Sequence, residues 1–155
     1  MDAEFSSSSG DDQASRRILA LDVGAKRIGL AVSDALGITA QGLEALQRRD
    51  KRSDMEGLAA VIEKYGVQEI VVGYPLHMSG SAGAQSLKVA DFAEDLRRRF
   101  SLPVHLWDER LTSAEANRLL RETEMSIRRR GQVVDRMAAT LILQSFLEHR
   151  ALSSE

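Results

Sequence analysis

The sequence contains no cysteine, so disulfide bonds and thiolate metal sites are both excluded. Its three histidines, His77, His105 and His149, are too scattered along the chain to indicate a three-histidine zinc site. Any bound metal is therefore expected to be held by carboxylates, imidazoles, amides or backbone groups.

Long apolar runs and an excess of basic charge are also missing. An apolar run such as residues 141–143 is far too short to cross a bilayer, so we expect no membrane association. The formal net charge of -2 excludes a polybasic nucleic-acid binder by bulk composition. Basic residues still cluster at 48–52, 97–99 and 128–130, and each cluster is either a solvated surface or a local phosphate-binding patch.

The length of 155 residues predicts one domain with a single substantial core. Residues 1–15 have the composition of a disordered tail, and we expect a folded domain at 16–150 and a short C-terminal tail at 151–155. The first residues resemble neither a secretory signal nor a transit peptide, which favours a cytoplasmic location.

Hydrophobic periodicity predicts five strands, at residues 18–23, 28–32, 38–46, 67–72 and 103–107. A helix is expected to begin at Ser53, with Glu56 completing a capping box, and to end at Gly66. Another helix follows the glycine- and serine-rich loop 73–83, a third begins at a second capping box formed by Thr112 and Glu115, and a last helix covers 134–146.

The order of these elements indicates the fold class. Three strands separated by turn-sized gaps predict an antiparallel meander, and the strand–helix units that follow predict parallel strands. We therefore expect an α/β fold whose mixed five-stranded sheet has three antiparallel strands, then two parallel ones, with helices on both faces.

Three carboxylates occupy positions that stability alone does not explain. Asp22 interrupts an apolar strand, Glu109 and its neighbour Asp108 follow the strand 103–107, and Asp135 lies in the first turns of the last helix. Each position has an ordinary explanation when it is taken alone. Asp22 can form a buried ion pair or a turn cap, Asp108 and Glu109 can lie in a solvated loop, and Asp135 can interact favourably with the helix dipole. Taken together, they can converge at one edge of the sheet, where they would repel one another unless cations bind.

Such an oxygen-rich cluster suits Mg²⁺ or Mn²⁺. Two such ions about 4 Å apart can activate water and stabilise the leaving oxygen in phosphodiester hydrolysis. The three carboxylates therefore predict a metal-dependent nuclease.

Four ordered motifs carry a resemblance to a known family. They are LDVGAKRIG at 21–29 with AVSD at 31–34, VGYPL at 72–76 with SGSAG at 79–83, DERLTSAEA at 108–116, and VDRMAA at 134–139 with LILQ at 141–144. Together they resemble the YqgF/RuvX family, described as Holliday junction resolvases and, for bacterial members, as pre-16S rRNA nucleases. The resemblance extends from about residue 17 to residue 150.

This resemblance implies an RNase H-like fold, and it implies that Asp22, Glu109 and Asp135 are the catalytic residues and bind the metal. It favours processing of the 5′ end of pre-16S rRNA, in ribosome biogenesis, over the alternative of resolving Holliday junctions. The partner is accordingly a structured RNA, or branched DNA in the alternative. A monomer is favoured over a weak dimer, and the role of Asp108 beside Glu109 stays open.

Basic residues near the carboxylates are candidates for nucleic-acid binding. Lys26 and Arg27 follow Asp22 on a tight turn, where they either grip a phosphate or are merely solvated. The loop 73–83 is either a phosphate cradle or an ordinary loop. Further candidates are Arg110, beside the acids, and a basic lip formed by Arg128, Arg129 and Arg130.

Two other functions share parts of this pattern. An actin-like ATPase also has an Asp-Val-Gly type of phosphate loop, but it needs two such domains to enclose its nucleotide. A non-catalytic nucleic-acid-binding module is the second alternative, and the presence of all three acids argues against it.

If arginine side chains hold the nucleic-acid backbone, affinity will fall steeply with salt, because binding releases condensed counterions. Replacing Arg128, Arg129 and Arg130 with alanine should reduce the slope of log K against log salt concentration, by roughly 0.7 to 0.9 for each phosphate that the variant no longer neutralises. Titrations of a labelled precursor rRNA at several salt concentrations measure this slope. An unchanged slope would place the basic surface elsewhere.

Overall fold

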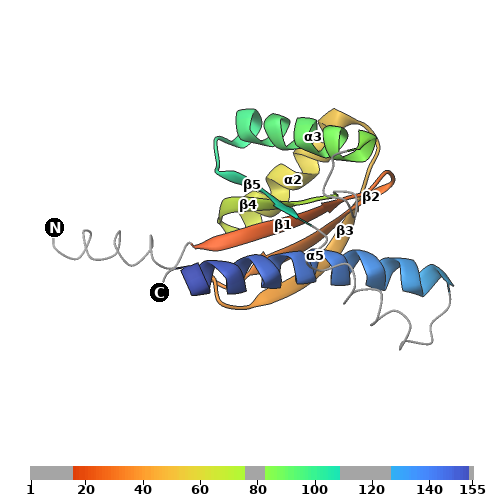
Figure 1. Ribbon diagram of the computed structural model, residues 1–155. Helices are drawn as coiled ribbons and strands as arrows, with labels where there is room; N and C mark the ends of the chain where they lie inside the picture. The colour runs from red at the N-terminus through yellow and green to blue at the C-terminus, as the bar shows by residue number, and fades with distance from the viewer. Residues whose placement is uncertain (1–15, 76–82, 109–126, 154–155) are drawn as a thin grey trace.

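The computed structural model of the protein describes residues 16–75, 83–108 and 127–153, of which 127–135 are described as backbone only. Five strands form one sheet in the order β3-β2-β1-β4-β5 (Figure 1). Their bounds are β1 Arg17–Val23, β2 Arg27–Ser33, β3 Ala40–Gln47, β4 Val67–Tyr74 and β5 Val104–Asp108.

The pairing confirms the predicted mixed sheet. Strands β1, β2 and β3 form an antiparallel meander, and β4 and β5 run parallel to β1 on its other side. Strand β1 thus lies in the middle of the sheet, between one antiparallel and one parallel neighbour.

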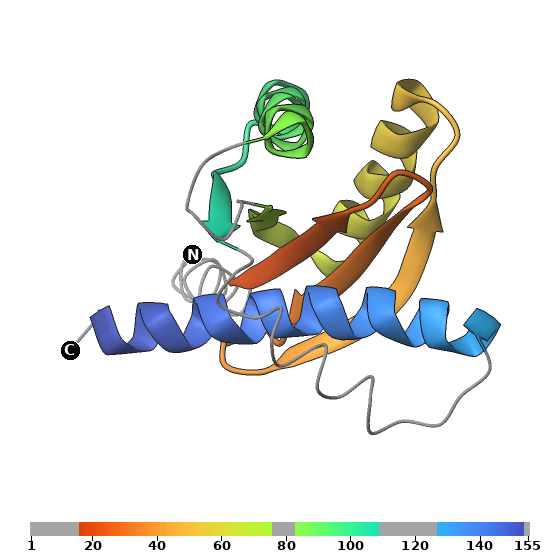
Figure 2. The same ribbon diagram turned by 45° about the vertical axis from the view of Figure 1, so that its right-hand side comes forward.

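Helices cover both faces of the sheet, as predicted. Helices α2 (Lys51–Tyr65) and α3 (Ala84–Phe100) lie on one face, and the long helix α5 (Ile127–Ser153) crosses the other (Figure 2). Alternate residues of β1 contribute to two separate cores: Leu19 and Leu21 pack with α2 and α3, whereas Ile18 and Ala20 pack with α5. In the described parts of the chain, no helix has the length and apolar character that a membrane span requires.

The start of α2 differs from the predicted capping box. The helix begins at Lys51, two residues earlier, because the Asp50 carboxylate accepts the backbone N–H of Ser53 at 2.8 Å. That hydrogen bond holds the pKa of Asp50 below its ordinary value. Glu56, expected to complete the box, instead pairs with Arg52 at 3.3 Å, whereas the predicted stop at Gly66 is confirmed by its left-handed backbone, φ 64°.

Other predicted boundaries also shift. Strand β3 begins at Ala40 rather than at residue 38, since the Ile38 N–H is bonded to the Asp34 carboxylate in the preceding turn. Helix α5 begins at Ile127, so Asp135 lies beyond its first two turns rather than at its start, and the helix continues through the first three residues of the expected C-terminal tail. The predicted tail 1–15 and the predicted helix after Thr112 lie outside the described residues.

Close packing positions α5 over the sheet. A Cβ atom at Gly42 in β3 would lie 2.9 Å from Oγ1 of Thr140, so only glycine allows the helix to approach this strand so closely. Toward the other end of α5, the Trp107 indole N–H donates to Ser145 Oγ at 3.1 Å, and its ring meets Phe146 edge-on. The helix therefore crosses the sheet from β3 to β5.

A polar contact ties the C-terminal end of α5 to β4. The Glu69 carboxylate accepts hydrogen bonds from both terminal nitrogens of Arg150, at 2.8 and 2.5 Å, and also contacts the His105 ring. The Arg150 hydrogen bonds, followed by the one from His105, hold the pKa of Glu69 below its ordinary value of 4.5. The ionised carboxylate is therefore the form that stabilises the fold.

Because the pKa of Glu69 is lowered in the folded state, its contribution to stability is fully present above pH 4.5 and is lost as pH falls through the lowered value. We expect Glu69→Gln to reduce the free energy of unfolding at pH 7 by roughly 1 kcal/mol, a figure kept small because Arg150 is partly exposed to solvent. Urea denaturation at pH 7 and below pH 4 measures the difference, which should shrink in acid. Glu148→Gln, an exposed position on α5, is the matched control, and an equal effect there would refute the assignment.

Candidate active site

The carboxyl ends of the three parallel strands meet at one edge of the sheet. Leu21 of β1 pairs with Val72 of β4, and Tyr74 of β4 pairs with Asp108, the last residue of β5. Asp22 and Asp108 therefore lie at the same edge, with β4 between their strands. Asp108 belongs to β5 itself, one residue beyond the predicted end of that strand.

Asp22 belongs to the face of the sheet that α5 covers. Its neighbours Leu21 and Val23 pack in the core under α2 and α3, so alternation along the strand directs Asp22 to the opposite side. Its side chain is half-buried, between a fully buried strand interior and an exposed turn. Asp22 is thus a carboxylate at a strand end that remains within reach of solvent ions.

The chain turns sharply two residues after Asp22. The Gly24 N–H donates to the Arg27 carbonyl at 2.9 Å, and a Cβ at Gly24 would lie 2.9 Å from that same oxygen. A side chain at position 24 would therefore force the turn open. The predicted tight turn is confirmed, with Lys26 exposed on it and Arg27 half-buried at the start of β2.

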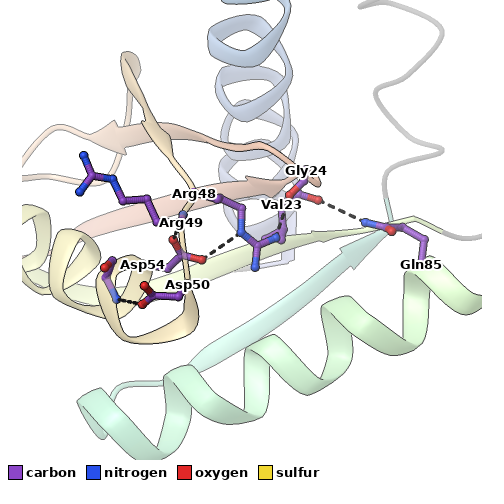
Figure 3. A network of polar contacts seen from close by, with 8 residues as sticks. Val23, Gly24, Arg48, Arg49, Asp50, Asp54 and Gln85 are labelled. Atoms are coloured by element: carbon purple, nitrogen blue, oxygen red, sulfur yellow. Dashed lines mark hydrogen bonds and ion pairs between the residues drawn. The ribbon is translucent and has the colours of Figure 1, made fainter.

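An arginine from the end of β3 holds this turn from the other face (Figure 3). Arg48 donates to the Gly24 carbonyl through one terminal nitrogen at 2.8 Å and to the Asp54 carboxylate through Nε at 3.0 Å. Asp54 is 2% exposed and also accepts the Arg49 N–H, while the Arg48 guanidinium lies over the Phe92 ring.

The Arg48–Asp54 pair is not among the predicted features, because Arg48 lies in a basic run that is typical of a solvated surface. The available signal was Asp54, which precedes Met55 and lies four residues before Leu58 on the buried side of α2. A carboxylate on an apolar helix stripe needs a partner, and the nearest basic run contains one.

A pocket of about 510 Å³ opens beside the turn, between the start of α2 and the start of α3. Val23, Gly24, Arg48 and Asp54 line one side, and residues of α3 such as Gln85 line the other. Gln85 donates to the Val23 carbonyl at 3.4 Å, so α3 also contacts the end of β1.

Several predicted site residues lie outside the described residues: Glu109, Arg110 and most of the loop 73–83, whose first two residues belong to β4. Asp135 and Arg128, Arg129 and Arg130 lie within α5, where the structure describes the backbone alone. Among the described side chains, no three histidine or carboxylate groups form a metal cluster. The structure thus positions one of the three predicted acids fully, places a second on a helix, and does not describe the third.

The chemistry of the donors at this edge fits a hard divalent cation. The Asp22 carboxylate lies at this edge on the α5 face, and oxygen donors are the ligands that Mg²⁺ and Mn²⁺ prefer. Asp108 lies at the same edge but on the opposite face, because Trp107 before it packs against the core under α5. The Arg48 guanidinium also lies on that opposite face, already paired with Asp54. It therefore does not compete with a cation for Asp22.

One family model and several known proteins match nearly all of the folded chain. Residues 16–149 match the family model described as "RuvX: Holliday junction resolvase". A protein of Koribacter versatilis is 59% identical over 139 residues, covering 90% of this chain and 91% of that protein, and one of Moorella thermoacetica is 51% identical over 132 residues, covering 85% and 94%. Both carry the name "Putative pre-16S rRNA nuclease".

Among solved structures, Thermus thermophilus RuvC, in complex with a Holliday junction substrate, has a TM-score of 0.51 and 14% identity, covering 88% of this chain and 96% of that one. At this identity the likeness concerns the fold alone. It confirms the RNase H-like fold that the four motifs implied.

Proposed function

This chain belongs to the RuvX family, and from that membership we propose that it is a metal-dependent nuclease that processes the 5′ end of pre-16S rRNA. The observation that carries the proposal is the position of Asp22, half-buried at the carboxyl edge of the sheet, within a family match that spans the folded chain. We also propose a cytoplasmic location, because the proposed substrate is precursor rRNA.

We assign metal binding to Asp22, Glu109 and Asp135. Glu109 directly follows β5, whose last residue lies at the same edge of the sheet as Asp22. Asp135 precedes Ala139 by four residues, and Ala139 is fully buried on the face that α5 covers. Helical spacing therefore supports a position for Asp135 on the side of α5 that faces the sheet. Asp22 lies on the face of the sheet that α5 covers.

When bound, Mg²⁺ or Mn²⁺, which we propose as a pair, would activate water and stabilise the leaving oxygen of the phosphodiester. The contribution of the protein is to hold its carboxylates in place before metal and substrate arrive. Lys26 and Arg27 lie on the turn after Asp22 and are proposed to bind phosphates that flank the scissile bond. We assign the same role to Arg110, Arg128, Arg129 and Arg130.

RNA processing is preferred to junction resolution on the basis of symmetry. Paired cuts in a four-way junction require two active sites in a fixed relation, hence a stable dimer with a substantial interface. The exposed large apolar side chains of the described residues come from four separate segments: Leu36 and Ile38 before β3, Leu87 in α3, Leu106 in β5 and Leu152 in α5. This distribution supports a monomer, and the names of the relatives agree with a nuclease of precursor rRNA.

Resolution of Holliday junctions remains the second candidate function. It is favoured by the description of the family model and by the fold shared with RuvC. Either activity would use the same carboxylates, because both are phosphodiester hydrolysis.

Each of Asp22→Asn, Glu109→Gln and Asp135→Asn is expected to abolish cleavage and leave the fold intact. Neutralising one acid in a cluster of like charges relieves repulsion in the metal-free protein, so stability should not fall. Cleavage assays in Mg²⁺, Mn²⁺, Ca²⁺ and excess chelator, with thermal melts of each variant, test this. Ca²⁺ should bind without supporting turnover, because it is larger and more loosely coordinated.

Two results would contradict the assignment. A variant that retains near-normal activity, or that unfolds, removes that residue from the proposed site. Full activity of the wild-type protein in excess chelator would remove the metal from the mechanism. Glu148→Gln, on the exposed side of α5, is the control and should cleave normally.

The substrate assignment is tested by comparing two labelled substrates, a precursor 16S rRNA fragment and a four-way DNA junction. We expect cleavage at the 5′ end of the rRNA, no paired symmetric cuts in the junction, and a monomer in sedimentation at micromolar concentration. A tight dimer that makes paired cuts would replace this proposal with the resolvase function.

A further inference from the structure

We infer that the Arg48–Asp54 pair positions Asp22 for metal binding by fixing the turn that follows it. This inference rests on the proposed function, since it takes Asp22 as a metal ligand. Arg48 and Asp54 are then positioning residues, which act through the backbone of residues 23–26 and do not touch the metal or the substrate.

Residue 48 is bonded to the turn at two points. Its side chain donates to the Gly24 carbonyl at 2.8 Å, and its backbone N–H donates to the Lys26 carbonyl at 2.9 Å. Within the turn, the Gly24 N–H is bonded to Arg27. The backbone on the exit side of Asp22 is therefore held on both sides of residue 25.

The guanidinium is itself held in one place. The Asp54 carboxylate accepts from Nε at 3.0 Å, and the Phe92 ring lies 5.4 Å from the guanidinium carbon. Asp54 also accepts the backbone N–H of Arg49 at 3.3 Å and is almost fully buried in the first turn of α2. Helix α2, through Asp54 (Figure 3), and helix α3, through Phe92, thus both fix the group that bonds to Gly24.

The Arg48–Asp54 pair lies on the opposite face of the sheet from the Asp22 carboxylate. Asp22 points to the α5 face of the sheet, and the Arg48–Asp54 pair lies on the α2 and α3 face. The guanidinium is neutralised by Asp54, so it neither pairs with the metal-binding carboxylate nor repels a cation across the strand. Arg48 therefore acts on Asp22 through its hydrogen bond to the Gly24 carbonyl. Removing groups that orient metal ligands typically lowers metal affinity about 10- to 100-fold.

The decisive variant removes both charges. A single substitution leaves an unpaired charge at a largely buried site and can unfold the protein, whereas Arg48→Met with Asp54→Asn removes the pair without that cost. The Gly24 carbonyl then has no side-chain donor. Arg48→Lys is a second variant, which keeps the charge beside Asp54 but lacks the planar fork that reaches both partners.

We propose to measure Mn²⁺ binding to the RNA-free protein by titration calorimetry, and hydrogen exchange at the Gly24 amide. The double variant should bind Mn²⁺ about tenfold more weakly than the wild type and exchange the Gly24 amide faster, and Arg48→Lys should show the same changes to a smaller degree. Two matched controls should keep wild-type affinity: Arg52→Ala, an exposed arginine on α2, and Gly66→Ala, which destabilises the left-handed end of α2 far from the turn.

The outcomes separate this inference from the proposed function. If Asp22→Asn abolishes Mn²⁺ binding and the folded double variant binds as tightly as the wild type, the inference is overturned and the proposed function stands. An equal fall in affinity in Gly66→Ala would also overturn it, because general destabilisation would then explain the effect. If Asp22→Asn binds Mn²⁺ normally, both fail, since there is no metal ligand at position 22 to position.

Discussion

Strand β1 is buried on both faces, and the parallel pairing of this strand with β4 organises the rest of the molecule. Its side chains alternate between a core under α2 and α3 and a core under α5, so each layer of helices packs against the same central strand. Such a strand has little tolerance for a change of register, because a shift of one residue would exchange its two sets of side chains. A carboxylate can be accommodated only where the strand leaves the core, and Asp22 lies there.

The two sides of this strand make different contributions to the site. On one side, α5 crosses the sheet and is tied to it at Gly42, at Trp107 and at Glu69. On the other, α2 and α3 enclose the Arg48–Asp54 pair and bring it to the turn after β1. The layer that carries a proposed metal ligand is thus distinct from the layer that stabilises the backbone of the site.

The sequence predicted the architecture well because hydrophobic periodicity determines which face of each element is buried. Sheet order, helices on both faces and the turn after Asp22 followed from local patterns and from four ordered motifs. The start of α2 and the role of Arg48 did not. Asp50 and Ser53 are both good capping residues, and the local hydrogen bond between them selects the earlier start. Arg48 lies in a basic run that is typical of a solvated surface, and its role depends on the burial of Asp54 and on the contact with the turn after β1, which is distant in the sequence.

Trp107 is the one tryptophan of the sequence, and it lies between the last strand and α5. Its indole N–H is bonded to Ser145, and its ring is in edge-on contact with Phe146 and His149. Selective excitation of tryptophan therefore addresses a single fluorophore, two residues before Glu109 and in contact with the helix that carries Asp135. Its emission offers a label-free optical signal of how closely that helix is docked on the sheet, in the same molecule in which cleavage is followed.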